Sequence, residues 1–322
     1  QREAEISAFQ PEPFYTVSLD CGGFTATGDK LKAKPEAEAV AAACKNKAVI
    51  VRAVERKEKS DKPPALYDLT TLQRDANRLL GYTAQQTLDY LQSLYEKKLC
   101  TYPRTDSRFL TGDMEASVPA LAAVAASVCG ADAPGNINAG QVCDSAKVSD
   151  HHAVVPTSGA GKADVSALPA GEREILRLVS RQLLCAVGGP HQYAETAVTL
   201  DCGGHGFTAK GKTVLVPGWK ACLQEQADKN GVPAKSKDFV GKGGATEQAS
   251  FSPRGGNEQS GVCDDAPELK EGQNVPVTSV SVKEGRTSPP KHFTEDTLLS
   301  AMETAGAKET PDDAERKGLG TP

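Results

Sequence analysis

The chain has 322 residues and a formal net charge of −5. This length is enough for two or three domains with hydrophobic cores of their own. No run of eighteen apolar residues occurs, and the charged first residues lack the apolar stretch of a signal peptide, so neither a membrane span nor a secretory leader is expected. The negative charge argues mildly against a nucleic-acid-binding protein, although a local basic surface binds phosphates whatever the net charge.

Nine cysteines are scattered along the chain, and none of them forms a C-x-x-C pair. A zinc ribbon is therefore not supported, and no metal site is expected in this chain. An odd, scattered set of cysteines in a chain of this length fits reduced thiols better than a disulfide framework. We therefore expect a cytoplasmic protein.

One short sequence occurs twice. Val17-Ser-Leu-Asp-Cys-Gly-Gly-Phe-Thr-Ala recurs as Val198-Thr-Leu-Asp-Cys-Gly-Gly, followed by Phe207-Thr-Ala. The alternating apolar positions predict strands, and the Gly-Gly pairs predict tight turns. Convergent hairpin composition is the simpler explanation, but nine matching residues make it less satisfactory. The repeat suggests one β domain interrupted by an inserted domain.

The inserted part has helical periodicity. Thr70 with Gln73 predicts a capping box for a helix that stops at Gly81, and Thr83 with Gln86 predicts the start of a second helix. The short connection is typical of a helix-turn-helix or of a simple αα-hairpin. The predicted apolar faces consist of Leu72, Ala76, Leu79 and Leu80 in the first helix, and of Ala84, Leu88, Leu91, Leu94 and Tyr95 in the second.

A tyrosine-arginine segment follows the second helix at once. Tyr102-Pro-Arg-Thr-Asp-Ser-Arg-Phe-Leu110 places a phenol two residues from Arg104 and six from Arg108. A phenol is a weak nucleophile at neutral pH, and a neighbouring cation both lowers its pKa and holds an anionic target. The planar fork of arginine suits a phosphate. The segment therefore predicts a tyrosine that attacks a phosphate, although an isolated Y-x-R would be better explained as an aromatic packed beside a surface Arg–Asp pair.

A second polar cluster is Ser149-Asp150-His151-His152, in a chain with only five histidines. One hypothesis is a metal-dependent phosphoesterase of the DHH type centred on Asp150, His151 and His152. Such enzymes need further aspartates at strand ends, and we find no D-x-D there, so this hypothesis ranks lower.

The remaining chain predicts four further elements. A leucine-rich stripe predicts a helix at about 170–187, and residues 226–265 have the Gly, Ser, Lys, Asp and Asn content of a long mobile loop. Strand texture resumes at 275–282, and a helix is predicted near 295–305.

The tyrosine segment as a whole resembles the active-site segment of type IA DNA topoisomerases, and Pro103 favours the topoisomerase III branch. The D-H-H-A-x-x-P-T segment that ends at Thr157 resembles one that follows the tyrosine in the same family. The two motifs are specific in combination. Weaker flanking matches are Arg2–Phe9, Leu66–Gln73, Gln92–Glu96, Gly218–Lys220, Pro289–Glu295 and Gly318–Pro322.

The resemblance implies an α+β fold in which a β-rich gate (hinge) domain is interrupted by an inserted, mainly helical, winged-helix-like domain that carries the tyrosine. The implied parts are the gate domain at 1–61 and 189–288, the tyrosine domain at 62–188, and the start of a truncated DNA-binding fourth domain at 289–322. No counterpart of the family's N-terminal Toprim domain occurs, so we expect a fragment of a longer enzyme.

The resemblance also implies a mechanism. Tyr102 would cleave single-stranded DNA through a 5′-phosphotyrosine, another strand would pass through the gate, and resealing would need no ATP. Arg104 would balance charge on the phosphate, and His151 would act as a hydrogen-bond donor or proton relay. Mg²⁺ would be held by the absent Toprim domain, and the fragment alone would be inactive.

Three residues are candidate DNA contacts by the same resemblance. Gln92 lies before the tyrosine, where a solvated helix face is nearly as good an interpretation. Arg108 would contact a phosphate or pair with Asp106, and Thr321 lies in the last matching motif.

The partners that the resemblance implies are single-stranded DNA and the missing Toprim domain of the same polypeptide, and no membrane is involved. The implied location is the bacterial nucleoid, and a monomer is favoured. A non-catalytic DNA clamp is the other alternative, against which the intact Tyr-x-Arg argues.

Overall fold

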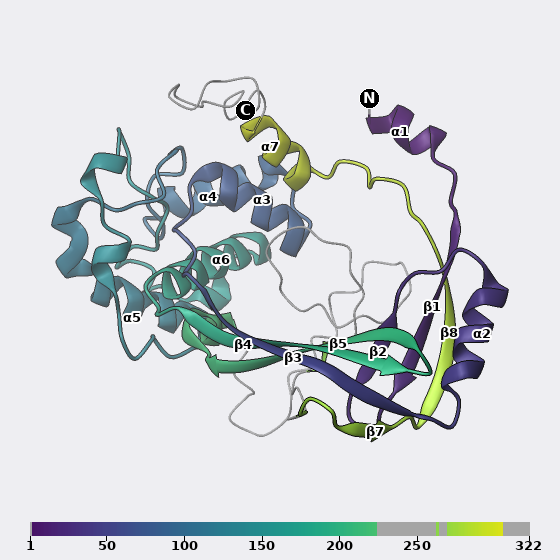
Figure 1. The fold of residues 1–322 in the computed structure, drawn as a ribbon. Helices are drawn as coiled ribbons and strands as arrows, with labels where there is room; N and C mark the ends of the chain where they lie inside the picture. The colour runs from purple at the N-terminus through teal and green to yellow at the C-terminus, as the bar shows by residue number, and fades with distance from the viewer. Residues whose placement is uncertain (1, 224–261, 264–268, 305–322) are drawn as a thin grey trace. The chain divides into compact units, whose positions relative to one another are not determined.

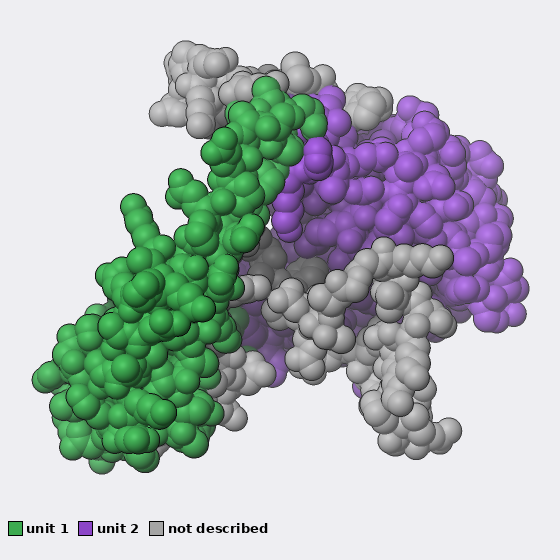
Figure 2. Space-filling model, turned by 90° about the vertical axis from the view of Figure 1, so that its right-hand side faces the viewer, with its two compact units in different colours: residues 1–60, 192–215, 227–290 green, residues 61–191, 216–226, 291–322 purple. Residues whose placement is uncertain are grey.

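The computed structural model describes residues 2–223, 262–263 and 269–304. The chain divides into two compact units, which are coloured separately in Figure 2. In the described part, no helix is both long and apolar enough to cross a membrane. Unit 1 comprises residues 1–60, 192–215 and 227–290, and unit 2 comprises residues 61–191, 216–226 and 291–322.

Unit 1 is built on an eight-stranded sheet, whose strands run in the order β7-β3-β4-β5-β2-β1-β8, with β6 beside β5 (Figure 1). The β6 pairing is parallel, whereas β1 pairs antiparallel with both β2 and β8. The fold is therefore a mixture of helices and antiparallel sheet, as predicted. The strands are β1 Pro13–Asp20, β2 Thr25–Gly28, β3 Ala48–Asp61, β4 His191–Cys202, β5 His205–Val216, β6 Val262–Cys263, β7 Asn274–Pro276 and β8 Ser279–Arg286.

The two copies of the repeated sequence form two hairpins of this one sheet. The first copy forms β1 and β2, and the second forms β4 and β5. The hairpins lie edge to edge, because β2 pairs antiparallel with β5 at Thr27 opposite Thr208. Gly22 and Gly203 occupy the same turn position with positive φ angles of 73° and 62°, which glycine adopts without strain. The repeat is thus a structural duplication within the sheet.

The core of unit 1 lies between the sheet and helix α2 (Lys34–Cys44), which packs against β1 and β8. Val17 and Leu19 point into this core, as the period-2 pattern of β1 predicts. Helix α1 (Arg2–Ala8) has no buried residue. The sequence does not predict α2 from apolar periodicity, because this helix is composed largely of alanine and glutamate. It does not predict α1 either, since that helix has no buried face.

Unit 2 is mainly helical. Residues 61–191 leave the sheet at the end of β3 and return at the start of β4, and these two strands are neighbours in the sheet. Short 3₁₀ helices connect the longer ones. The α-helices are α3 Leu69–Leu80, α4 Ala84–Glu96, α5 Val118–Cys129, α6 Ala170–Ala186 and α7 Glu295–Glu303, and the 3₁₀ helices are η1 Gly112–Ser117, η2 Ala139–Gln141, η3 Ser145–Lys147, η4 Val165–Ala167 and η5 Gly218–Leu223.

The start of α3 differs from the prediction. Asp68, not Thr70, is the N-cap residue, and its carboxylate accepts from the amide of Thr71 at 2.7 Å. Thr70 is buried inside the first turn instead. An aspartate is as good a cap as a threonine, and the capping box here uses Thr71 in the place of Gln73. The predicted end at Gly81 is correct, because Gly81 takes the left-handed C-cap conformation.

Helix α6 organises the two hydrophobic cores of unit 2. Ile175 and Leu176 belong to a core shared with α3 and α4, whereas Leu183 and Leu184 belong to a core shared with α5. The helix predicted at about 170–187 corresponds to α6, Ala170–Ala186, and its predicted C-terminal end differs from the observed one by a single residue. Helix α5 was not predicted, because it is apolar and alanine-rich and has no polar face to reveal a period.

The C-terminal elements lie near the predicted positions. Strands β7 and β8 cover the predicted strand at 275–282, and α7 corresponds to the predicted helix near 295–305. Helix α7 packs on α3, where Arg74 pairs with Asp296 at 2.9 Å. Whether residues 289–322 begin a separate domain stays a prediction. Most of the predicted mobile loop at 226–265 lies outside the described residues.

Candidate active site

Helix α4 positions the tyrosine segment. The predicted capping box of Thr83 and Gln86 starts the helix, and Leu91 and Leu94 anchor it in the core with no exposed surface. After the helix, Lys98 takes a left-handed conformation with φ of 61°, and the amide of Leu99 donates to the Leu94 carbonyl at 2.8 Å. The chain therefore turns sharply just before Tyr102, whose backbone starts from a fixed helix end.

The ring of Tyr102 contacts two other rings. Its centroid lies 4.3 Å from that of His151, with the two planes tilted by 41°. On α4, Tyr95 meets Tyr102 edge to face, at a centroid distance of 5.5 Å and an angle of 82°. The structure therefore brings together the tyrosine and the first histidine of the D-H-H segment, which are about fifty residues apart in sequence.

Three hydroxyl side chains hold the tyrosine segment against the D-H-H segment. Thr101 accepts a hydrogen bond from the amide of Val155 at 3.0 Å, and Thr105 donates to the carbonyl of His151 at 2.8 Å. Ser107 donates to the Lys147 carbonyl at 2.8 Å. Thr105 and Ser107 are buried, so the bonds are shielded from water. These bonds fix the spacing between the two segments on which Tyr102 and His151 lie.

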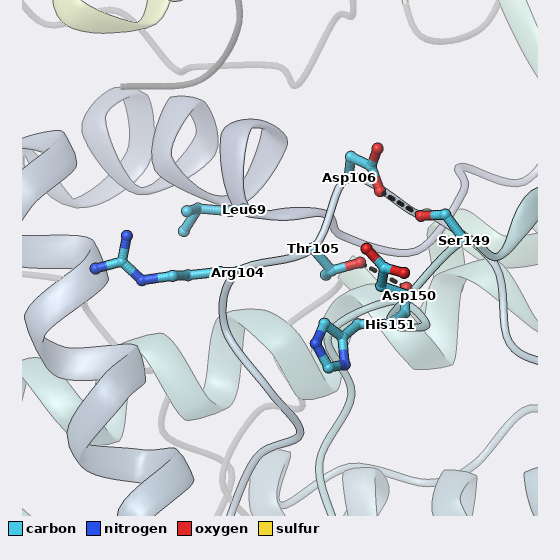
Figure 3. A pocket seen from close by; sticks show the side chains of 7 residues that line it. All are labelled: Leu69, Arg104, Thr105, Asp106, Ser149, Asp150 and His151. Carbon is cyan, nitrogen blue, oxygen red and sulfur yellow. Dashed lines mark hydrogen bonds between the residues drawn. The ribbon is translucent and has the colours of Figure 1, made fainter.

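A pocket of about 450 Å³ opens beside these segments. Figure 3 shows that Arg104 and His151 both line it but point in different directions, with the guanidinium extending away from the imidazole. Arg104 and His151 are both exposed. The predicted convergence is thus close for Tyr102 and His151, and Arg104 shares the pocket without approaching the histidine ring. The lining residues are Leu69, Arg104, Thr105, Asp106, Ser149, Asp150 and His151.

Some charged side chains near Tyr102 in sequence have polar partners, and others have none among the described residues. Asp106 accepts a hydrogen bond from Ser149 at 3.2 Å, and Lys97 pairs with Glu172 at 2.5 Å. Lys98 and Arg104, on either side of Tyr102 in sequence, have no ion-pair partner among the described residues. A guanidinium without an ion-pair partner, on a residue that lines a pocket, is suited to bind an anion such as a phosphate.

Two of the three predicted DNA contacts, Gln92 and Arg108, lie among the described residues. Gln92 is on α4 and donates to Glu96 at 3.0 Å. Arg108 donates from Nε to the carbonyl of Leu66 at 3.0 Å, and Asp106 is bonded to Ser149 rather than to Arg108. Thr321 lies outside the described residues. Neither Gln92 nor Arg108 lines the pocket.

The D-H-H segment does not have the geometry of a metal site. His152 directs Nδ1 to the carbonyl of Ala153 at 2.8 Å, and it does not line the pocket with Asp150 and His151. Across residues 2–223, 262–263 and 269–304, no group of three His, Cys, Asp or Glu side chains could hold a metal ion. The phosphoesterase hypothesis therefore has no support from the arrangement of these side chains.

The thiol nearest in sequence to the tyrosine is not an accessible nucleophile. Cys100 is buried, and burial raises its pKa to about 12. Because the thiolate is the reactive form, this cysteine is inert at neutral pH. Tyr102, by contrast, is half-exposed.

Comparison with known proteins shows the family to which the chain belongs. A family model described as DNA topoisomerase matches residues 1–322. The chain belongs to the DNA topoisomerase family. It is 35% identical to DNA topoisomerase 3 of Bacillus subtilis over 324 residues, which cover 95% of the chain and 40% of that protein. It is 33% identical to DNA topoisomerase 3 of Shouchella clausii over 335 residues, covering 99% of the chain and 41% of that protein. The chain is therefore topoisomerase III-like, of type IA, as the sequence motifs predict.

A solved structure supports the fold. Full-length topoisomerase I from Thermotoga maritima superposes with a TM-score of 0.66 at 22% sequence identity, covering 95% of this topoisomerase chain and 46% of that one. The chain spans about 40% of the length of the curated relatives that it matches.

Two features of the site were missed at the sequence level. Tyr95 was assigned to the apolar face of its helix, but it is 40% exposed and contacts Tyr102. One signal was available, since Tyr95 follows Leu94 directly and adjacent residues of a helix point about 100° apart. Thr105 carried no signal, because its bond to the backbone of His151 depends on the fold.

Proposed function

We propose that Tyr102 is the nucleophile of a type IA DNA topoisomerase and that it attacks a backbone phosphate of single-stranded DNA. The phenolic oxygen forms a bond to phosphorus, the bond from phosphorus to the 3′-oxygen breaks, and that oxygen leaves as a 3′-hydroxyl. The product is a 5′-phosphotyrosine, which conserves the phosphodiester energy, so the reverse step reseals the strand without ATP. The contact between the Tyr102 and His151 rings carries this proposal, because it joins the two motifs in one site.

The roles of the neighbouring residues follow from their positions. Arg104 is the candidate for balancing charge on the phosphoryl oxygens, since it lines the pocket and has no carboxylate partner in the described part of the chain. His151 is the candidate hydrogen-bond donor or proton carrier, since its ring contacts that of Tyr102. It would take the proton from the tyrosine, or deliver one to the leaving oxygen. Gln92, Arg108 and Thr321 remain candidate DNA contacts, and the first two of them lie outside the pocket lining.

Mg²⁺ is the cofactor that the family implies, but the described residues do not fit a Mg²⁺ site. Asp106 and Asp150 line the pocket, yet they belong to no group of three possible ligands among the residues described. We propose that the metal is held by a Toprim domain elsewhere in the full-length polypeptide. We also propose that unit 1 acts as the hinge of a gate through which a second strand passes, with the protein working as a monomer at the bacterial nucleoid.

The proposal is tested with the full-length polypeptide and a single-stranded oligonucleotide labelled at its 3′ end. Cleavage by a 5′-phosphotyrosine leaves the label covalently attached to protein, which is seen as a shifted band on a denaturing gel. Tyr102→Phe should abolish the band, because the substitution deletes only the oxygen that forms the ester. Tyr90→Phe, in the same helical unit, is the matched control and should retain it. A shifted band that persists in Tyr102→Phe would assign the nucleophile to another residue.

A further inference from the structure

Tyr95 is an exposed aromatic on an otherwise amphipathic helix. Its neighbour Leu94 is fully buried, whereas Tyr95 is 40% exposed. The other aromatics of this region behave differently, since Tyr82 and Tyr90 are half-buried and pair with each other edge to face at 5.2 Å. No hydrogen bond ties the Tyr95 hydroxyl to any described residue. The Tyr95 ring therefore buries only part of its apolar surface in the core. The part that stays exposed is available to bind a ligand.

The position of Tyr95 connects it to the reacting group. Its ring meets that of Tyr102 edge to face at a centroid distance of 5.5 Å, so a molecule that contacts the Tyr95 ring lies close to Tyr102. The edge-to-face contact also leaves part of the Tyr95 surface uncovered, as its exposed fraction of 40% requires. A base flanking the scissile phosphate would therefore pass this ring.

The charges suit a nucleic acid strand. Lys98 follows Tyr95 by three residues, Arg104 follows Tyr102 by two, and neither cation has a carboxylate partner in the described residues. Proteins that bind single strands combine such cations, which contact the phosphates, with aromatic rings on which bases stack. Glu96, the nearest acidic residue on α4, accepts a hydrogen bond from Gln92.

From these observations we infer that Tyr95 is a base-stacking site, which binds one nucleobase of the single strand beside the phosphate that Tyr102 attacks. This inference rests on the proposed function for the identity of the strand. Stacking on Tyr95 is a binding contact that forms before the strand is cleaved. It therefore does not require the phenolic oxygen of Tyr102. Stacking on an aromatic face is tolerant of base identity, so the site fixes the position of the strand rather than its sequence.

The inference is tested by photocrosslinking and by affinity. Single-stranded oligonucleotides carrying one 5-iodouracil at successive positions are irradiated with the Tyr102→Phe full-length polypeptide, which cannot cleave. Mass spectrometry should locate the crosslink at Tyr95 for one position of the analogue. Fluorescence anisotropy at low salt should show binding weakened about 5- to 150-fold by Tyr95→Ala. Tyr95→Phe should bind almost as the parent does, because the ring is retained, and Gln85→Ala, an exposed change on the same helix, should have no effect.

An abasic site separates stacking from a folding defect. Removing the one base that crosslinks should weaken binding by the parent protein, but it should cause no further loss in Tyr95→Ala, because the partner ring is already gone. A Tyr95→Phe variant as weak as Tyr95→Ala, additive losses in the abasic test, or crosslinks only at other residues would each overturn the inference. The proposed function fails separately, through a covalent band that survives Tyr102→Phe, and the stacking result does not depend on that outcome.

Discussion

At the scale of single residues, the hydroxyl of Tyr102 differs from those of Tyr67 and Tyr82, two other tyrosines of the helical unit. Tyr67 donates its hydroxyl proton to Asp75 at 2.6 Å, and Tyr82 is bonded to Glu174. Partial burial, followed by the contact with Glu174, raises the pKa of Tyr82 to about 12. Both hydroxyls are thereby held in the protonated, unreactive form. Within the described residues, the hydroxyl of Tyr102 has no such carboxylate acceptor. Its ring is positioned by contacts with the rings of Tyr95 and His151.

Arg104 gives a residue-scale prediction. In the full-length polypeptide, Arg104→Ala should lower the rate of covalent adduct formation about 10²- to 10³-fold, the usual cost of removing one donor that stabilises developing charge. Arg104→Lys should recover only part of the loss, because an ammonium cannot make two parallel hydrogen bonds to a phosphate. Single-turnover kinetics on the labelled oligonucleotide measure this rate. Equal rates for the alanine variant and the parent would assign charge stabilisation to another group.

At the scale of elements, the packing of α6 on α4 depends on Gly171. A Cβ atom at this position would lie 2.4 Å from the ring of Tyr90, which is closer than any real contact. In an isolated helix, Gly→Ala is stabilising by roughly 1 kcal/mol. Here Gly171→Ala should instead lower the free energy of unfolding by about 1–3 kcal/mol, because the ring must move or the helices must separate.

Urea denaturation followed by circular dichroism measures this effect. Gly135→Ala is the control, since a Cβ there meets no atom within 4 Å. Combining Gly171→Ala with Tyr90→Leu should recover part of the stability by removing the clashing ring. Unchanged or increased stability in Gly171→Ala alone would contradict the packing described for the two helices.

The elements also show what the sequence could and could not predict. α4 and α6 were predictable because their apolar residues recur with the helical period, and the Gly-Gly turns of the repeat were predictable because only glycine adopts their backbone without strain. Helix α5 was not, since Val118–Cys129 has almost no polar residue to define a face. The contact between Tyr102 and His151 could be expected only from the family resemblance, because no local pattern relates residues so far apart in sequence.

At the scale of the whole molecule, the helical unit is inserted between two neighbouring strands of the sheet. Residues 61–191 leave at the end of β3 and return at the start of β4, so the covalent links of this long segment lie side by side. The helical unit is also joined to the sheet unit at other points, because residues 216–226 and 291–322 belong to it as well. The entry and exit of the inserted segment on neighbouring strands are the feature that motivates the hinge proposed for unit 1.

Taken alone, the 322-residue chain should not cleave DNA. It carries the candidate nucleophile, but its described residues offer no group of three metal ligands, and it spans about 40% of the length of its topoisomerase 3 relatives. Because phosphoryl transfer depends mainly on positioning and charge stabilisation, the chain alone should neither relax supercoiled DNA nor form a covalent adduct, with or without Mg²⁺. Adding the N-terminal portion of the full-length polypeptide should restore the adduct, and Tyr102→Phe should remove it again. A covalent band from the chain alone would show that it contains everything cleavage needs, and the metal site would then have to be sought within it.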